Sequence, residues 1–159
     1  MPQDGDPALR SNNPAPPSAV LDTNVVLDWL VFRDPAVQAL AAALEEGRLR
    51  WLACARMRDE LAVVLVRPQL ERWRPDPAQT LSAFDRLAVA CAAPPPSLLV
   101  CRDGDDQVFV DLALAHRSRW LLTHDRALLA LARQARPHGT TIISPRSWSA
   151  LARHADAGA

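Results

Sequence analysis

The chain has 159 residues, of which 49% are hydrophobic and 23% are charged, a composition ordinary for one globular domain with a single core. Eighteen basic and eighteen acidic side chains cancel at neutral pH, so no net charge draws the molecule towards nucleic acid or an anionic membrane. Nucleic-acid binding would therefore have to come from local patches. All eighteen basic residues are arginine, and the absence of lysine excludes Schiff-base chemistry and the phosphate loop of Walker-type nucleotide hydrolases.

Two further features of composition bear on the cellular setting. Cys54, Cys91 and Cys101 show no paired spacing, which indicates neither a disulfide framework nor a zinc knuckle and favours core packing. Residues 1–17 are polar and rich in proline, with no apolar run typical of a signal peptide or a membrane anchor. We therefore expect a cytoplasmic protein with no membrane association. The same composition buries too little surface to offset the entropy of ordering, so residues 1–17 are predicted to form a disordered tail.

From Ser18 onwards, short apolar runs alternate with longer stretches of helical spacing, which is typical of an α/β protein with a parallel sheet. One domain is predicted over residues 18–153, followed by a short tail at 154–159. The apolar runs predict five strands covered on both faces, at 19–22, around Leu52, and at 98–101, 120–123 and 140–143. Apolar stripes and proline positions predict helices at 37–44, 57–65, 77–89, 106–116, 125–134 and 145–153.

Acidic residues cluster where ligands bind in such a sheet, beyond the carboxyl ends of the strands. Asp22 ends the first predicted strand and Asp125 follows the fourth, so both carboxylates are expected on one rim. Asp106 opens the helix after the third predicted strand, on that helix's apolar face. Glu60 lies about one turn into its helix, from which its side chain could reach over the sheet edge. Four acids from four distant segments are thus expected to converge.

Converging carboxylates raise one another's pKa values or require cations. Mg²⁺ and Mn²⁺ prefer hard carboxylate and water oxygens, and two such ions about 3.5 to 4 Å apart stabilise both the attacking and the leaving oxygen of a phosphodiester. The cluster therefore indicates phosphoryl-transfer hydrolysis.

Each acid also has a local explanation. Asp22 and Asp125 could cap the helices that follow them, and Asp103 is favoured as an N-cap with Asp106 at position N3 of the same helix. Asp106 differs because an acid on an apolar face would carry a desolvation cost if it had no partner. Glu60 is balanced between a functional residue and a solvated edge residue. Solvent exposure or local capping is assigned to Asp28, Asp34, Asp85 and Asp111, and surface or loop positions to His116, His124, His138 and His154.

Four motifs in order resemble the PIN-domain family over residues 20–148: Leu21-Asp22-Thr23-Asn24, Asp59-Glu60-Leu61, Asp103-Gly104-Asp105-Asp106 and Thr123-His124-Asp125. They are similar in particular to the branch of VapC-like ribonucleases, the toxins of toxin–antitoxin pairs. The resemblance implies a three-layer α/β/α sandwich with a five-stranded parallel sheet, and Mg²⁺- or Mn²⁺-dependent endoribonuclease activity on RNA. It also implies a cognate antitoxin protein and a homodimer.

Residue by residue, Asp22, Glu60, Asp106 and Asp125 match the family's acidic quartet. The first, third and fourth of these are expected to hold the metal, and Glu60 to position it or a second ion. Asn24 and Thr123 match polar positions that orient carboxylates or water, and Asp103 matches an additional acid of this branch, which tempers its assignment as a cap. Arg56 and Arg58 are expected to contact the RNA backbone, because guanidinium matches phosphate geometry.

Alternative functions come from other classes. A phosphoacceptor signalling domain also places acids at strand ends, but its chemistry normally needs a lysine and this chain has none. A non-catalytic PIN-like module that binds nucleic acid or protein is a second alternative, and a structure-specific DNA nuclease is a third, because carboxylate-bound metals do not themselves read the 2′-hydroxyl.

Overall fold

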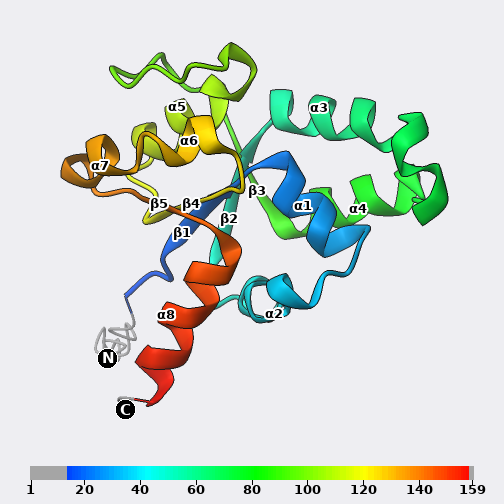
Figure 1. The fold of residues 1–159 in the computed structure, drawn as a ribbon, viewed down its shortest axis with the longest axis horizontal. Helices are drawn as coiled ribbons and strands as arrows, with labels where there is room; N and C mark the ends of the chain where they lie inside the picture. The colour runs from blue at the N-terminus through cyan, green and yellow to red at the C-terminus, as the bar shows by residue number, and fades with distance from the viewer. Residues whose placement is uncertain (1–13, 158–159) are drawn as a thin grey trace, which may run out of the picture.

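The structure is a computed structural model that describes residues 14–157, and its centre is a parallel sheet (Figure 1). The sheet has five strands in the order β3-β2-β1-β4-β5. Their bounds are β1 Ser18–Leu21, β2 Arg50–Cys54, β3 Ala88–Cys91, β4 Trp120–Leu122 and β5 Thr141–Ile143. The predicted five-stranded parallel sheet is therefore confirmed.

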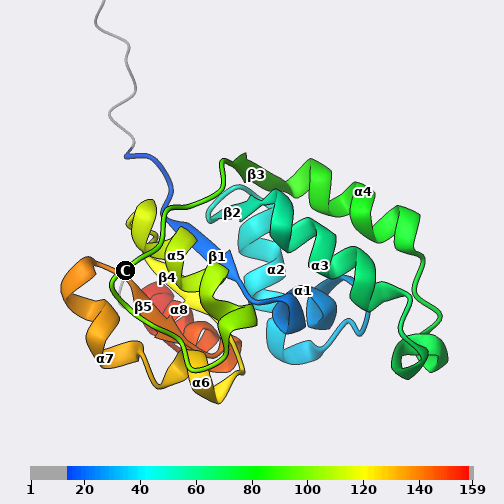
Figure 2. The same ribbon diagram turned by 90° about the horizontal axis from the view of Figure 1, so that it is seen from above.

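Helices cover both faces of the sheet. In both views α5, α6 and α7 gather on one side of it and α1 to α4 on the other (Figures 1 and 2), and α8 packs against α2 on that second side. This arrangement confirms the three-layer α/β/α sandwich. The helices are α1 Thr23–Leu30, α2 Gln38–Glu45, α3 Ala55–Leu65, α4 Pro77–Leu87, α5 Gln107–Ala115, α6 Arg126–Leu129, α7 Ala132–Ala135 and α8 Pro145–Ala157. Short 3₁₀ helices are η1 Pro35–Val37, η2 Pro68–Trp73, η3 Gly104–Asp106 and η4 Arg136–His138.

The central strand explains why the sequence folds this way. Ala19, Val20 and Leu21 of β1 are all buried, since β1 lies between β2 and β4 and is covered by helices on both faces. Within residues 14–157, no helix is long and apolar enough to cross a membrane.

An aromatic cluster anchors the α1–α4 side of the core. The ring of Trp51, on β2, meets Trp29 of α1 edge-on at 5.5 Å and Phe84 of α4 at 4.7 Å between centroids. Edge-to-face pairs of this kind contribute about 0.5–1.5 kcal/mol beyond their buried area. The cluster therefore fixes α1 and α4 relative to the strand between them.

The third predicted strand was wrong. β3 is Ala88–Cys91, which overlaps the end of the predicted helix 77–89, and residues 98–101 lie in the connector between β3 and η3 instead. The connector alternates like a strand, with Leu98 92% and Val100 76% exposed and the residues between and after them buried. Its polar partner is a side chain: the Gln107 amide accepts from Cys101 N (2.7 Å) and donates to Leu99 O (2.7 Å). Buried and exposed residues do alternate in this segment, but its backbone bonds to the Gln107 side chain instead of to a neighbouring strand.

Several helix predictions needed correction as well. α1 was not among the predicted helices, the predicted helix 125–134 is divided into α6 and α7, and α8 continues beyond residue 153 to Ala157. Residues 1–13 and 158–159 lie outside the described residues, so the predicted tails and the domain limits stay predictions.

Candidate active site

The sheet order places the ends of β1 and β4 side by side. The chain leaves β1 towards β2 and β3, then returns to the other side of β1 as β4, which makes the β1–β4 edge the switch point of the sheet. Asp22 N donates to Leu122 O at 3.0 Å, and Thr123 N donates to Ile143 O at 3.1 Å. The polar residues just past the strands are therefore still held by the sheet.

Asp22 is a buried carboxylate with one strong partner. It is 4% exposed, and the hydroxyl of the fully buried Thr123 donates to its Oδ2 at 2.7 Å. Burial raises the pKa of Asp22, the Thr123 hydrogen bond opposes this, and the charge of Asp125 raises it further. Asp22 precedes α1, yet its side chain makes no capping hydrogen bond, although the nearby amides of Asn24 and Thr23 moderate its pKa. Capping therefore does not explain this acid.

Glu60 faces the same site from α3. Thr23 Oγ1, at the start of α1, donates to Glu60 Oε2 at 3.0 Å. Burial is the main cause that raises the pKa of Glu60; the charges of Asp22 and Asp105 add to it, while the Thr23 hydrogen bond and Arg56 lower it. A solvated edge residue would show none of these effects, so the structure brings Glu60 to the cluster.

Asp106 is the most perturbed acid. Burial, and then the charges of Asp22, Asp125, Asp103 and Glu60, raise its pKa from 3.8 to about 7. Asp106 ends η3 and stands at the start of α5, but its carboxyl makes no capping bond. This carboxyl is therefore subject to repulsion from the other members of the quartet without any local compensation.

Asp103 and Asp125 do cap helices. Asp103 Oδ1 accepts from Asp105 N at 3.0 Å, so the cap predicted for Asp103 is confirmed, and its charge also acts on Asp106. Asp125 Oδ1 accepts from Ala127 N (2.7 Å) and Leu128 N (3.2 Å) at the start of α6. Asp125 N donates to the same Thr123 hydroxyl that holds Asp22 (2.9 Å). One threonine thus joins two acids of the quartet, and capping occupies only one oxygen of Asp125.

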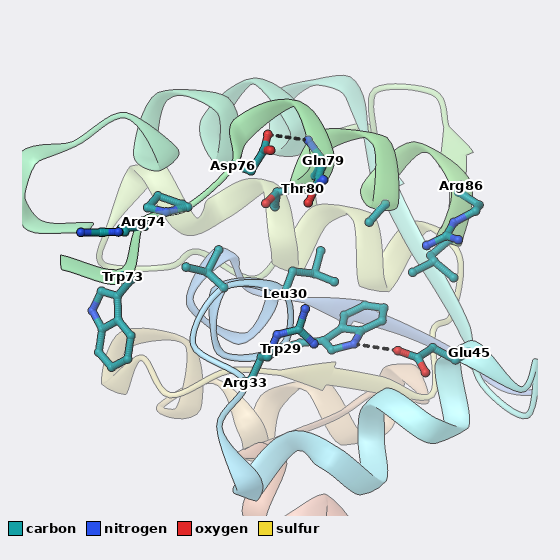
Figure 3. A pocket seen from close by; sticks show the side chains of 14 residues that line it. Trp29, Leu30, Arg33, Glu45, Trp73, Arg74, Asp76, Gln79, Thr80 and Arg86 are labelled. Carbon is teal, nitrogen blue, oxygen red and sulfur yellow. Dashed lines mark hydrogen bonds between the residues drawn. The ribbon is translucent and has the colours of Figure 1, made fainter. Parts of the chain in front are cut away.

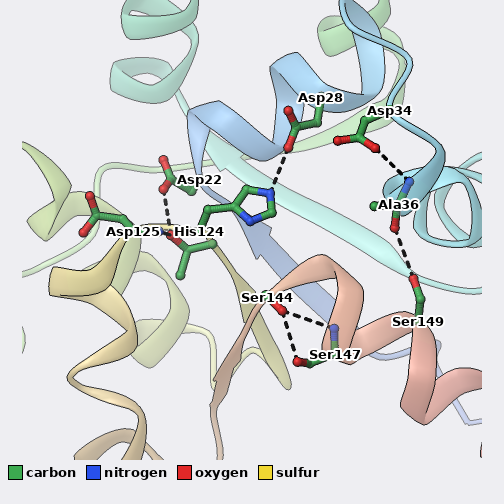
Figure 4. Close-up of polar contacts among 10 residues, drawn as sticks. Asp22, Asp28, Asp34, Ala36, His124, Asp125, Ser144, Ser147 and Ser149 are labelled. Carbon is green, nitrogen blue, oxygen red and sulfur yellow. Dashed lines mark hydrogen bonds and ion pairs between the residues drawn. The ribbon is translucent and has the colours of Figure 1, made fainter.

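An additional pair ties the β4–α6 loop to α1. His124 Nε2 lies 2.9 Å from Asp28 Oδ2, between the two elements that carry Asp125 and Asp22 (Figure 4). The prediction that Asp28 is solvated or caps locally was wrong. His124 is exposed in a loop as expected, yet it has a definite partner. Sequence spacing could not reveal this pair because 96 residues separate its members.

Other predicted residues take different roles. Arg58 Nε and Nη2 bind Asp85 in a bidentate pair at 2.7 and 2.9 Å, which links α3 to α4 and engages this guanidinium. Arg56 is exposed beside Glu60. Asp111 accepts from Ser97 N (2.9 Å) and from Gln107 Nε2 (2.8 Å), so its assignment to solvent or local capping was wrong. Asp85 is exposed to solvent, as predicted, and has Arg58 as its partner there. Asp34 caps η1 as predicted.

Two residues near the cluster had no assigned role there. Thr23 lies inside the motif that drew attention to Asp22, but its contact with Glu60 depends on the packing of α1 beside α3. Cys101 is buried, as its predicted core role requires, and its thiol pKa is raised by burial and by the charges of Asp106, Asp125 and Asp103. Neither contact could be derived from spacing along the chain.

The donor set fits a hard divalent cation. It consists of carboxylate oxygens, which Mg²⁺ and Mn²⁺ prefer, and the three ion pairs among residues 14–157 leave all four acids without a cationic partner. As placed, no three acidic, histidine or cysteine side chains in this part of the chain are close enough to share one ion. The chemistry of the donors, rather than a preformed cage, supports the fit.

The fold and the acids define the class of protein. A family model described as "PIN domain" matches residues 18–127, from the start of β1 into α6, and that match includes all four acids. The chain belongs to the PIN-domain family. This is generally a nuclease fold, and its members are typically nucleases that use divalent metals. No curated protein matches the chain.

Proposed function

We propose that this PIN-domain protein is a cytoplasmic Mg²⁺- or Mn²⁺-dependent endoribonuclease, the toxin of a toxin–antitoxin pair. The observation that carries the nuclease proposal is the convergence of Asp22, Glu60, Asp106 and Asp125 at the switch point, with three of the four pKa values raised. A site that concentrates negative charge without a cationic partner is suited to bind a metal ion rather than to stabilise the fold.

In this proposal Asp22, Asp106 and Asp125 hold the metal ion and Glu60 positions it or a second ion. A bound Mg²⁺ or Mn²⁺ supplies positive charge at the phosphodiester and lowers the pKa of a water nucleophile. The Thr123 hydroxyl orients Asp22, and the Thr23 hydroxyl orients Glu60. Asn24 is exposed at the start of α1, and in this proposal it orients a carboxylate or a water molecule.

The raised pKa of Asp106 adds a proton step. A carboxyl must be ionised to bind a metal, so near neutral pH Asp106 would have to lose its proton before it could hold the ion. The exposed Arg56, whose charge acts on Glu60, is proposed to contact a phosphate of the RNA. Arg58 is the weaker candidate for such a contact because Asp85 already occupies its guanidinium.

The toxin role, the cognate antitoxin and the homodimer rest on the resemblance of the four ordered motifs. Expression of the wild type should arrest growth, and Asp106→Asn should not, if the protein is a toxin. Light scattering on the purified chain tests the homodimer, and a monomeric mass would contradict it.

The decisive assay measures cleavage of single-stranded and structured RNA and DNA with Mg²⁺ or Mn²⁺, with chelator, and with Asp22→Asn and Asp106→Asn. Asp59→Asn is the matched control, because Asp59 is an exposed acid on the same helix as Glu60. We expect metal-dependent RNA cleavage that both site variants lose and the control keeps. Undiminished cleavage by Asp106→Asn would refute this site, and DNA cleavage alone or no cleavage at all would favour the alternative functions.

A further inference from the structure

A polar groove lies away from the acids, between the end of α1 and α4, with the segment that joins η2 to α4 at one end. It encloses a cavity of about 430 Å³, within the range of ligand sites. Arg33 lies at its centre, Trp73 and Arg74 at one end, and Arg86 at the other (Figure 3). Three guanidinium groups therefore surround one hollow.

The groove also contains two acids, Glu45 and Asp76, which offset part of its positive charge but form no ion pair with its arginines. Glu45 accepts from Trp29 Nε1 at 3.3 Å, and Asp76 accepts from Gln79 N at 3.1 Å as the cap of α4 (Figure 3). The ion pairs found among residues 14–157 involve none of Arg33, Arg74 and Arg86. These arginines are thus available to an anionic ligand.

Two of these arginines occupy a backbone conformation that disfavours them. Arg33 has φ 51° and Arg74 has φ 46°, in the left-handed region where a residue with a Cβ is strained and glycine is not. Both positions are exposed, so packing does not require a long side chain there. The fold carries this conformational cost at two arginines that line the same groove.

Trp73 adds an aromatic surface. Its ring packs against Phe32 at 4.8 Å and lies under the guanidinium of Arg72 at 4.9 Å, yet it remains 44% exposed. Arginines interleaved with an exposed aromatic ring are the elements that bind single-stranded nucleic acid, where the cations contact the backbone and the ring stacks on a base. An acidic peptide would use the arginines but not the ring.

Two parts of the chain, α1 and the stretch from α3 to η2, run from the acids to the groove. α1 begins directly after Asp22 and ends at Leu30 in the groove, and its eight residues span about 12 Å. α3 carries Glu60 and leads through η2 to Trp73. A strand of a few nucleotides lying along α1 would reach from the acids to the groove.

We propose that this groove binds single-stranded RNA a few nucleotides from the cleaved bond, with Arg33, Arg74 and Arg86 on the phosphates and Trp73 stacked on a base. This rests on the proposed nuclease function. The groove would select substrates that extend past the acidic cluster and would tighten their binding without contacting the reacting phosphate.

The backbone conformation supplies an unusually clean test. Arg33→Gly combined with Arg74→Gly removes two charges while relieving two left-handed strains, so the melting temperature should stay the same or rise. Arg117→Gly is the matched control: it is exposed, has φ 47°, and precedes β4 at the opposite end of the strand from Asp125. Because the control removes one positive charge and the double variant two, a loss of binding free energy more than twice that of the control could not be attributed to unfolding or to net charge alone.

Binding of a fluorescent single-stranded RNA is measured in chelator, so that cleavage does not interfere, as a function of salt. We expect roughly tenfold weaker binding by the double variant, and a salt-dependence slope smaller by about 1.4, since each phosphate contact on a single strand contributes about 0.7. Trp73→Ala should weaken binding at least about fivefold. Arg117→Gly should bind like the wild type.

Equal losses in the double variant and the control, or no loss in the double variant, would overturn the proposal. So would displacement of the RNA by a polyglutamate peptide at lower concentration than by unlabelled RNA, which would indicate a protein ligand. A cleavage assay distinguishes failure of the groove proposal from failure of the nuclease proposal. In the double variant, KM for a long RNA should be raised, while kcat and the cleavage of a dinucleotide should be unchanged. Groove-dependent binding by a wild type that cleaves nothing would refute only the nuclease function.

Discussion

Asp85 and Asp106 show how differently the fold treats two carboxylates. Asp85, on the exposed surface of α4, has a bidentate arginine partner, and that hydrogen bond with Arg58 lowers its pKa. Asp106, at the carboxyl edge of the sheet, meets other acids and no arginine, and its pKa rises to about 7. The chain is rich in arginine, yet none of the arginines among residues 14–157 forms an ion pair with the quartet. The acids of the quartet therefore concentrate negative charge that no arginine of the described residues pairs with, which is the feature on which the proposed metal site depends.

The largest expected effect is on catalysis. Asp22→Asn and Asp106→Asn should each reduce metal-dependent cleavage at least about 100-fold, because even outer residues that orient metal ligands are worth about 10- to 100-fold. Asp85→Asn should leave cleavage unchanged, since its partner is an arginine. Initial rates with a fluorogenic RNA measure this. An equal loss of cleavage rate in all three variants would contradict the different roles given to Asp85 and Asp106.

The next effect concerns the hydroxyl that joins Asp22 and Asp125. Thr123→Val keeps the shape of this buried side chain but removes the donor to Asp22 and the acceptor of Asp125 N. We expect cleavage to fall about 10- to 100-fold, with the apparent affinity for Mn²⁺ reduced in parallel. Thr123→Ser should retain most of the activity because it retains the hydroxyl. Full activity in Thr123→Val would show that the carboxylates need no such orientation.

The next prediction concerns how the free energy of unfolding depends on pH through Asp106. In chelator, native Asp106 keeps its proton up to about pH 7, whereas the unfolded chain loses it near 3.8, so the native state binds more protons in between. Its contribution to the free energy of unfolding therefore decreases as the pH rises through that interval. Thermal unfolding should show Asp106→Asn more stable than the wild type at about pH 8 and little different near pH 4.

Mn²⁺ should stabilise the wild type more than Asp106→Asn and so act against the difference expected in chelator. At about pH 8 the ion should raise the melting temperature of the wild type more than that of Asp106→Asn, because binding to the native state alone stabilises it. A wild type whose stability responded to neither pH nor Mn²⁺ would contradict the electrostatic account of the cluster.

The smallest effect belongs to the surface pair. Asp85→Asn removes a solvent-exposed ion pair, whose contribution is small and screened by salt. We expect only a slight change in melting temperature, and a smaller one in high salt. A large loss of stability would mean that the link from α3 to α4 matters far more than its exposure indicates.

The sequence predicted the fold correctly where a short apolar run is followed directly by an acidic residue. Short apolar runs beside Asp22 and Asp125 predicted two central strands and put both acids on one edge, because parallel strands end at the same side of a sheet. The sequence was misleading where the residue pattern does not reveal the hydrogen-bond partner. Residues 98–101 alternate like a strand, but their backbone bonds to the Gln107 side chain instead of to another strand. The small residues of β3 resemble the end of a helix, although they pair with β2. The contacts of Glu60 with Thr23 and of His124 with Asp28 depend on tertiary packing, so no spacing rule could reveal them.

The Gln107 amide has one more consequence. Its bond to Cys101 N closes a ring of the chain around residues 101–107, and this ring contains Asp103 and Asp106. A closed segment has fewer conformations than an open loop, so folding itself already restricts where the Asp106 carboxyl can lie. If the proposed ion binds there, part of the entropy that a mobile loop would lose on binding it would already have been lost on folding. A neutral side chain, one position along from the most strongly perturbed acid, thereby limits how far that acid can retreat from its neighbours.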